Sequence, residues 1–125
     1  MPQTRQILGM DLNDRPLPIR DGVIKYKGGL GENKVNVAVI GAGQTRTYVQ
    51  KDYSTAKSMI TVSTENDGDI ELFLREVAKG SNTGVIYTNV GDPILLTNLY
   101  LTTEPEYEFG GEGAVELVFE GDPVN

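Results

Sequence analysis

The sequence predicts a mainly β fold, either a β-sandwich or a partly closed barrel of about seven strands, with one flanking α-helix at about residues 67–79. Two observations support this prediction. Apolar residues recur at every second position in several short stretches, as in strands with one buried face. Only one stretch has the helical period. The 125 residues, 38% of them hydrophobic, suffice for a single domain with one core.

The predicted strands are short and separated by turn formers. They are expected at residues 22–27, 35–39, 45–49, 58–64, 85–87, 94–103 and 114–120. In the strand at residues 94–103, one face is expected to hold Leu95, Thr97, Leu99 and Leu101. In the last strand, Val115, Leu117 and Phe119 are expected to point inward. Residues 1–21 are expected to be an extended arm or irregular lead-in, because Pro16 and Pro18 cannot join a central strand.

Residues 37–43 resemble the strand and glycine turn of a dinucleotide-binding fold. Such a site needs a third glycine and a helix that holds the pyrophosphate. Arg46 occupies the third glycine position, and strand-like residues follow it. We therefore expect Gly41-Ala42-Gly43 to be a hairpin turn and expect no cofactor.

The helix is predicted from an apolar pattern at i, i+3, i+4 and i+7, formed by Ile70, Phe73, Leu74 and Val77. Residues 66–69 supply capping oxygens, and Glu71 can pair with Arg75 one turn later. Gly80 is expected to be a left-handed C-cap. Calcium binding by residues 65–71 is the alternative interpretation of the acidic turn, but Leu74 stands where an EF-hand needs its bidentate Glu, so no metal is expected.

The composition argues against an enzyme. The chain has no Cys and no His, so it lacks a thiolate nucleophile and the usual general base at neutral pH. A carboxylate-based hydrolase remains an alternative, with Glu104, Glu106 and Glu108 as candidates. These three alternate with other residues in a stretch expected to be exposed, where nothing would raise one pKa selectively.

Charge is unevenly distributed along the chain. The net charge is −7, and residues 80–125 contain eight acidic residues and no Lys or Arg. The first 79 residues therefore carry about +1. This excess of acidic over basic residues makes nucleic-acid binding a poor hypothesis for the chain. It leaves three interpretations open: solubility, a surface that repels a passing polyanion, or a positive patch on one copy that meets a negative patch on the next.

Long connections are expected at residues 11–22, 28–34 and 50–57, and such connections often bind partners. Tyr48 and Tyr53 bracket the last of them and are candidate interface anchors, although ordinary half-exposed residues would look the same. The residues expected to make self-assembly contacts are Arg15, Arg20, Tyr48, Lys51 and Tyr53.

No signal peptide is visible, and the longest apolar stretch is far shorter than the roughly 20 residues that span a bilayer. Synthesis in a cytoplasm and no membrane contact are expected.

The second half of the chain has a recognisable order of elements. A β-branched strand, an acidic turn, a lone helix, two strands and a closing strand that ends Phe-Glu-Gly-Asp occupy residues 59–64, 66–69, 70–78, 83–87, 95–101 and 113–122. This order resembles the tail tube proteins of contractile-tailed bacteriophages, over about half of the chain.

The resemblance implies one tail-tube-like domain over residues 1–125. It implies a virion structural protein that forms rings, as hexamers, which stack into a tube inside a contractile sheath. The implied partners are other copies, the sheath, the tape-measure protein and the baseplate, and DNA passes through without specific binding. The alternatives are the inner tube of a type VI secretion-like machine, a tail terminator or completion protein, and a free-standing β-sandwich that binds a carbohydrate or a protein.

Overall fold

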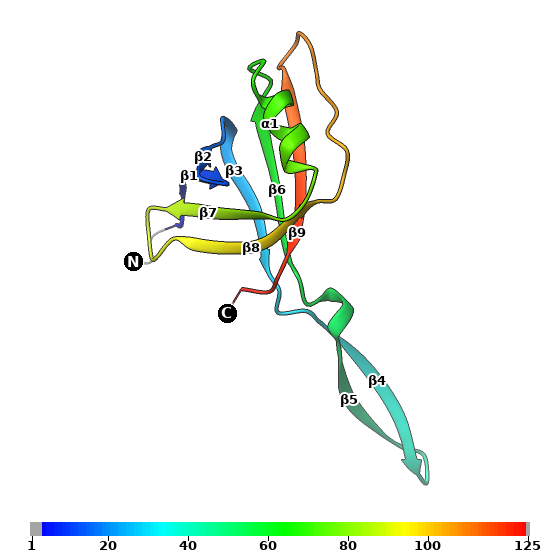
Figure 1. Ribbon diagram of the computed structural model, residues 1–125. Helices are drawn as coiled ribbons and strands as arrows, with labels where there is room; N and C mark the ends of the chain where they lie inside the picture. The colour runs from blue at the N-terminus through cyan, green and yellow to red at the C-terminus, as the bar shows by residue number, and fades with distance from the viewer. Residues whose placement is uncertain (1–3, 125) are drawn as a thin grey trace.

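The computed structural model describes residues 4–124 and confirms a mainly β fold with one helix (Figure 1). The strands are β1 (Ile7–Leu12), β2 (Arg15–Pro16), β3 (Ile19–Gly28), β4 (Glu32–Gly41), β5 (Gln44–Asp52), β6 (Ser58–Glu65), β7 (Asn82–Thr88), β8 (Ile94–Leu101) and β9 (Ala114–Gly121). The helices are α1 (Ile70–Val77) and the short 3₁₀ turn η1 (Tyr53–Thr55).

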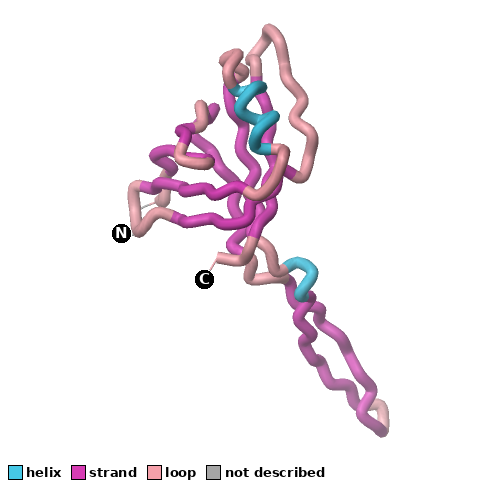
Figure 2. Tube along the Cα trace, viewed as in Figure 1, coloured by secondary structure: helices cyan, strands magenta, loops and turns pink. Residues whose placement is uncertain are grey.

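Seven strands form one antiparallel sheet in the order β2-β1-β7-β8-β9-β6-β3, which curls into a half-barrel. β7 and β8 cross over β6 and β9, so the curled sheet has two faces that enclose the core (Figure 1). β4 and β5 pair only with each other. They form a separate hairpin that projects away from the barrel (Figure 2).

The core lies between the two halves of the curled sheet and under α1. It holds fourteen buried apolar residues: Met10, Leu12, Leu17, Ile60, Val62, Ile70, Leu74, Val77, Ile86, Leu96, Leu99, Val115, Leu117 and Phe119. The inward face predicted for β9 is confirmed, since Val115, Leu117 and Phe119 are fully buried.

Helix α1 follows the predicted pattern but is shorter than residues 67–79. Asp67 Oδ1 accepts hydrogen bonds from the amides of Asp69 and Ile70 at 3.1 and 3.0 Å, so the acidic turn caps the helix. The predicted pair of Arg75 and Glu71 is confirmed at 3.1 Å. No helix within residues 4–124 is long and apolar enough to span a membrane.

The predicted C-cap at Gly80 is wrong. Ala78 occupies the C-cap with a φ of −70°, and Gly80 has no positive φ. The helix ends in right-handed geometry, so it needs no glycine there.

The lead-in predicted for residues 1–21 is wrong from Ile7 onward; residues 1–3 lie outside the described part. β1 pairs with β7 and buries Met10 and Leu12 in the core. The prolines are accommodated because Pro16 lies in the two-residue edge strand β2. The carbonyl of Pro18, between strands, accepts the amide of Glu65 at 2.9 Å.

The face predicted for β8 is half wrong. Leu95 and Leu99 do not share a face, because Leu99 is buried while Leu95 is 66% exposed, and Leu96 is buried instead of Leu95. Asn98 has a φ of 52°, and the pairing of β7 with β8 shifts register at the same place. This bulge adds one residue and moves Leu96 and Leu99 to the same side.

Candidate self-assembly surface

The projecting hairpin of β4 and β5 is the most unusual surface of the described chain. Its strands have ten and nine residues, longer than most strands of the barrel, and its register runs from Glu32 opposite Asp52 to Gly41 opposite Gln44. At about 3.3 Å per residue, the hairpin extends roughly 30 Å. Ala42 and Gly43 both have positive φ, 44° and 79°, as a tight two-residue turn requires. The predicted hairpin turn is therefore confirmed.

One face of the hairpin is apolar and β-branched. Cross-strand pairs place Val35 beside Val49, Val37 beside Thr47 and Val39 beside Thr45. We call this surface the valine face: Val35, Val37, Val39, Thr45, Thr47 and Val49. Its first three valines are 62%, 65% and 74% exposed. No other part of the described chain covers these valines. Their apolar side-chain surface is therefore exposed to water, and a neighbouring molecule could bury it.

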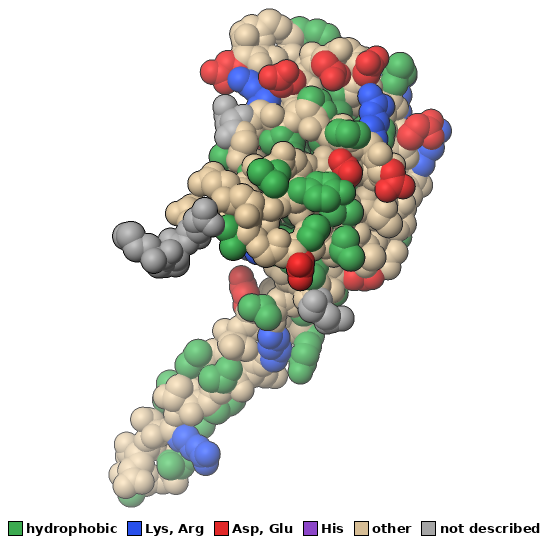
Figure 3. Space-filling model, turned by 90° about the vertical axis from the view of Figure 1, so that its left-hand side faces the viewer, with side chains coloured by type: hydrophobic (Ala, Val, Ile, Leu, Met, Phe, Trp, Pro, Cys, Tyr) green, Lys and Arg blue, Asp and Glu red, His purple; other side chains and the backbone are tan. Residues whose placement is uncertain are grey.

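The opposite face of the hairpin is polar and carries two cations. It consists of Lys34, Asn36, Ala38, Arg46, Tyr48 and Gln50. Lys34 and Arg46 form no ion pair with any residue between 4 and 124. In Figure 3, apolar and basic side chains are visible along the hairpin, and most of the acidic side chains lie on the barrel. Toward the base, the same face also carries Glu32 and Asp52, and Lys34 helps to lower the pKa of Asp52. The hairpin is therefore an amphipathic ribbon whose polar face is positive toward the tip, at Arg46.

The base of the hairpin is fixed by a network of short contacts. Asp52 accepts the amide and hydroxyl of Ser54 at 3.1 and 2.6 Å, which lowers the pKa of the Asp52 carboxyl. Thr55 Oγ1 accepts the amide of Glu32 at 2.6 Å and donates to the carbonyl of Asp52 at 2.7 Å. These bonds tie η1 to the first residue of β4 and the last residue of β5, so the hairpin leaves the barrel in a defined direction.

The end of the chain also braces this base. The amide of Val124 donates to the carbonyl of Gly28 at 2.8 Å. Gly29 has a φ of 95°, and a Cβ there would lie 2.7 Å from the Cα of Pro123, so only glycine fits. An open groove of about 570 Å³ lies beside the base; its lining is formed by residues 27–32, Ser54, Thr55, Lys57 and Met59.

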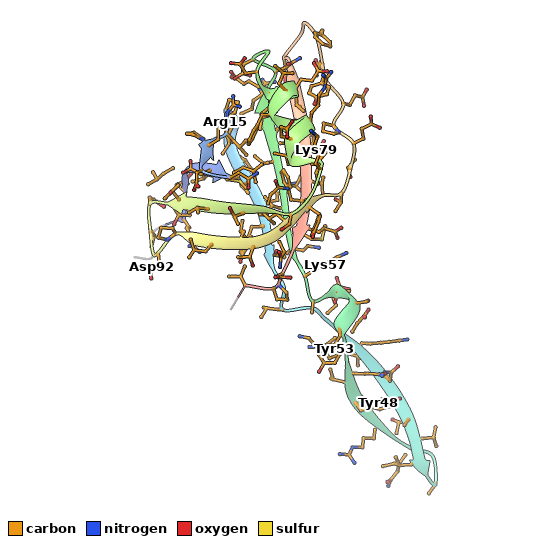
Figure 4. All side chains as sticks on the ribbon, in the orientation of Figure 1. Arg15, Tyr48, Tyr53, Lys57, Lys79 and Asp92 are labelled. Carbon is orange, nitrogen blue, oxygen red and sulfur yellow. The ribbon has the colours of Figure 1, made fainter. Side chains whose placement is uncertain are left out.

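Three of the five residues predicted to make assembly contacts belong to the hairpin. Tyr48 lies on its polar face and Tyr53 in η1, 49% and 79% exposed (Figure 4). Lys51 is partly buried and donates to the carbonyl of Leu30, so it secures the base.

The other two predicted residues, Arg15 and Arg20, lie elsewhere and contact their own chain. Figure 4 places Arg15 at the opposite end of the molecule, where its guanidinium stacks over the ring of Phe73 at 4.7 Å. Arg20 Nη1 donates to the carbonyl of Glu112 at 2.6 Å, with the Glu112 carboxylate 3.7 Å away. The structure does not bring the five residues to one surface.

Sequence reasoning missed the main feature of this surface, the valine face. The alternation of Val35, Val37 and Val39 predicted the strand but not its departure from the barrel. The sequence does contain a signal for this departure from the barrel. On the first strand the valines alternate with Lys34, Asn36 and Ala38. On the second strand Thr45 and Thr47 supply no large apolar side chain. Such a pair has too little apolar content to bury inside a core.

The far end of the molecule carries the acidic counterpart. The connection between β8 and β9, residues 102–113, runs past α1 (Figure 1), and Glu104, Glu106 and Glu108 project from it, exposed as predicted. Within residues 4–124 these three form no ion pair. Leu72 of α1 and Phe109 of the connection are 63% and 83% exposed. We call α1 together with residues 102–113 the acid-rich end.

The described residues 4–124 contain no group of three or more Asp or Glu side chains arranged to hold a metal ion. Comparison of the sequence with protein-family models finds no family that matches it, and comparison with curated proteins finds no significant match.

Proposed function

We propose that this chain is a structural protein that assembles with copies of itself into stacked rings, and that the rings form the inner tail tube through which phage DNA is ejected. The proposed kind of assembly, a tube of stacked rings, comes from the resemblance of residues 59–122 to tail tube proteins. The single observation that carries the proposal is the valine face, an apolar surface on a projecting arm that the subunit itself leaves in water.

The energetics of the hairpin favour a partner. An isolated two-stranded hairpin is at best marginally stable in water. Both outer backbone edges of β4 and β5 are also unpaired within residues 4–124. A neighbour that covers the valine face and borders these edges would stabilise the hairpin and remove a surface prone to aggregation.

The curled sheet offers a second means of association. β3 pairs only with β6, and β2 only with β1, so the sheet ends in open edges on both sides. Copies arranged around a rotation axis can place such edges beside one another and form a closed ring. A ring surface of net negative charge, from a chain with −7, would not adhere to DNA that slides past it.

The experiment that tests the proposal measures assembly against concentration and salt. Purified protein is examined by light scattering coupled to gel filtration and by negative-stain microscopy. We expect rings or tubes above a critical concentration. A variant in which Asn-Gly replaces residues 34–50 should stay monomeric, because Asn33 and Lys51 are paired and a two-residue turn can join them.

Other outcomes identify other functions. A monomer at high concentration that binds a carbohydrate or peptide in the groove at the hairpin base would support a free-standing binding module and overturn the proposal. Turnover of a glycoside that is lost in Glu106→Gln would support a hydrolase. Closed rings that never stack would favour a terminator or completion protein over a tube subunit.

A further inference from the structure

We propose that the hairpin of one copy docks on the acid-rich end of the next copy along the tube. This inference rests on the proposed function and adds to it the partner surface for the valine face. The first observation is position: the hairpin and the acid-rich end lie at opposite ends of the molecule (Figure 1). A contact between opposite ends of identical chains repeats without closing, as a stacked tube requires.

The second observation is charge. Lys34 and Arg46 on the hairpin have no ion-pair partner within residues 4–124, and neither do Glu104, Glu106 and Glu108 at the acid-rich end. Lys34 is partly compensated, because its charge helps to lower the pKa of Asp52 on the same hairpin. Arg46, nearer the tip, and the three glutamates at the other end are complementary between copies. Two hairpins would instead place like charges together, which disfavours pairing through this arm.

The third observation is apolar matching. The acid-rich end exposes Leu72 and Phe109, so it offers large apolar side chains beside its carboxylates. The valine face can cover these two side chains. The ribbon is only two strands wide, about 5 Å between strand axes. Long side chains such as those of Lys34 and Arg46 can therefore extend past its edges toward the glutamates of the acceptor, and screening is weak over distances below the Debye length of about 8 Å.

The outer face of β1, β7 and β8 is the competing acceptor, since it exposes Leu8 and Leu95. Val85 and Leu95 are cross-strand neighbours there. Asp11 and Asp14 lie close enough to Tyr87 of this face to raise its pKa. The face has no series of alternating glutamates like that in residues 104–108, so it matches the hairpin cations less well. We therefore assign the acid-rich end as the acceptor and use Leu95 as the test of the alternative.

A charge-swap experiment tests the assignment. One variant carries K34E and R46E, and the other carries E104K, E106K and E108K. Each alone should need at least tenfold more protein than the wild type to form tubes. An equal mixture should assemble at nearly the wild-type concentration, because each reversed hairpin meets a reversed acceptor. Circular dichroism and thermal melting confirm that both variants fold.

Cross-linking gives an independent measurement, because the chain has no native cysteine. Thr47→Cys protein is mixed with Phe109→Cys protein under mild oxidation, and with Leu95→Cys protein as the matched control. Disulfide-linked dimers should form with Phe109→Cys and at least tenfold less with Leu95→Cys.

The outcomes separate this inference from the proposed function. If the wild type never assembles, the proposed function fails. Self-assembly through the hairpin stands if the wild type assembles and the hairpin-shortened variant does not. The assignment of the acid-rich end is nevertheless overturned if the mixture of charge-swapped variants stays unassembled and Thr47→Cys forms its disulfide with Leu95→Cys.

Discussion

Replacing the three valines of β4 by threonine should weaken assembly about a hundredfold and leave the folded subunit unchanged. Val35, Val37 and Val39 are each about two-thirds exposed. Full burial of a valine contributes about 1.5 kcal/mol, so docking the remaining exposed part contributes about 1 kcal/mol per residue. The triple variant V35T/V37T/V39T therefore loses about 3 kcal/mol of association energy, and about 1.4 kcal/mol corresponds to a factor of ten.

Threonine is the informative substitution because it keeps the branched shape that strands favour. The three positions contact only the hairpin, so the free energy of unfolding of the monomer should change by less than about 0.5 kcal/mol. The assay is sedimentation of tubes over a concentration series, with chemical denaturation of the same samples. The matched control is N36T/A38T, on the opposite face of the same strand.

Three results would contradict this reasoning. If the triple variant assembles at the wild-type concentration, the valine face is not buried between copies. If the monomer unfolds at clearly lower denaturant, the valines support the subunit itself. If the control weakens assembly as strongly as the triple variant does, the two faces of the hairpin are not distinguished by the contact.

Three further predictions concern the subunit. Asn82→Ala should lower the free energy of unfolding by about 1–3 kcal/mol, because Asn82 Nδ2 donates to three carbonyls at 2.9–3.0 Å in a buried site; a loss under 0.5 kcal/mol in denaturant titration would refute this role. Arg15→Ala should remove the stacking contact with Phe73, lower the free energy of unfolding by about 0.5–1 kcal/mol and leave assembly unchanged. A loss of tubes, measured by light scattering, would instead show that Arg15 takes part in assembly. Burial raises the pKa of Tyr26 above 10.0, so its neutral form favours the folded state, and stability should fall as the pH rises past 10; Tyr26→Phe should reduce that fall in thermal melts, and an identical pH profile would count against it.

The parts of the fold that sequence could predict are those governed by local period. The inward face of β9 and the buried side of α1 follow from alternation and from helical spacing, because nothing interrupts either pattern. Leu96 could not be predicted, because one bulge at Asn98 reverses the alternation and a single positive φ leaves little trace in composition. β1 does not follow from the sequence, because Pro16 and Pro18 close by disfavour a strand, while Met10 and Leu12 alone form too short an alternating pattern.

The candidate site was predictable only in part for a different reason. Periodicity identifies a strand and its apolar face, but it does not say which surface covers that face. Tyr48 and Tyr53 lie on the arm and at its base, whereas Arg15 and Arg20 bind their own chain. For Val35, Val37 and Val39, the sequence predicts a strand with one shared face but not that this face is exposed.

The path of the backbone through the hairpin has a mechanical consequence. β3 continues into β4, and β5 returns through η1 into β6, while β3 and β6 are themselves hydrogen-bonded neighbours. A pull on the tip of the arm is thus transmitted along covalent bonds into β6, which is bonded on both sides, to β3 and to β9. If copies stack as proposed, β6 would carry the tension between them and distribute it to β3 and β9 and to the core. The contacts between subunits would then yield before a subunit unfolds.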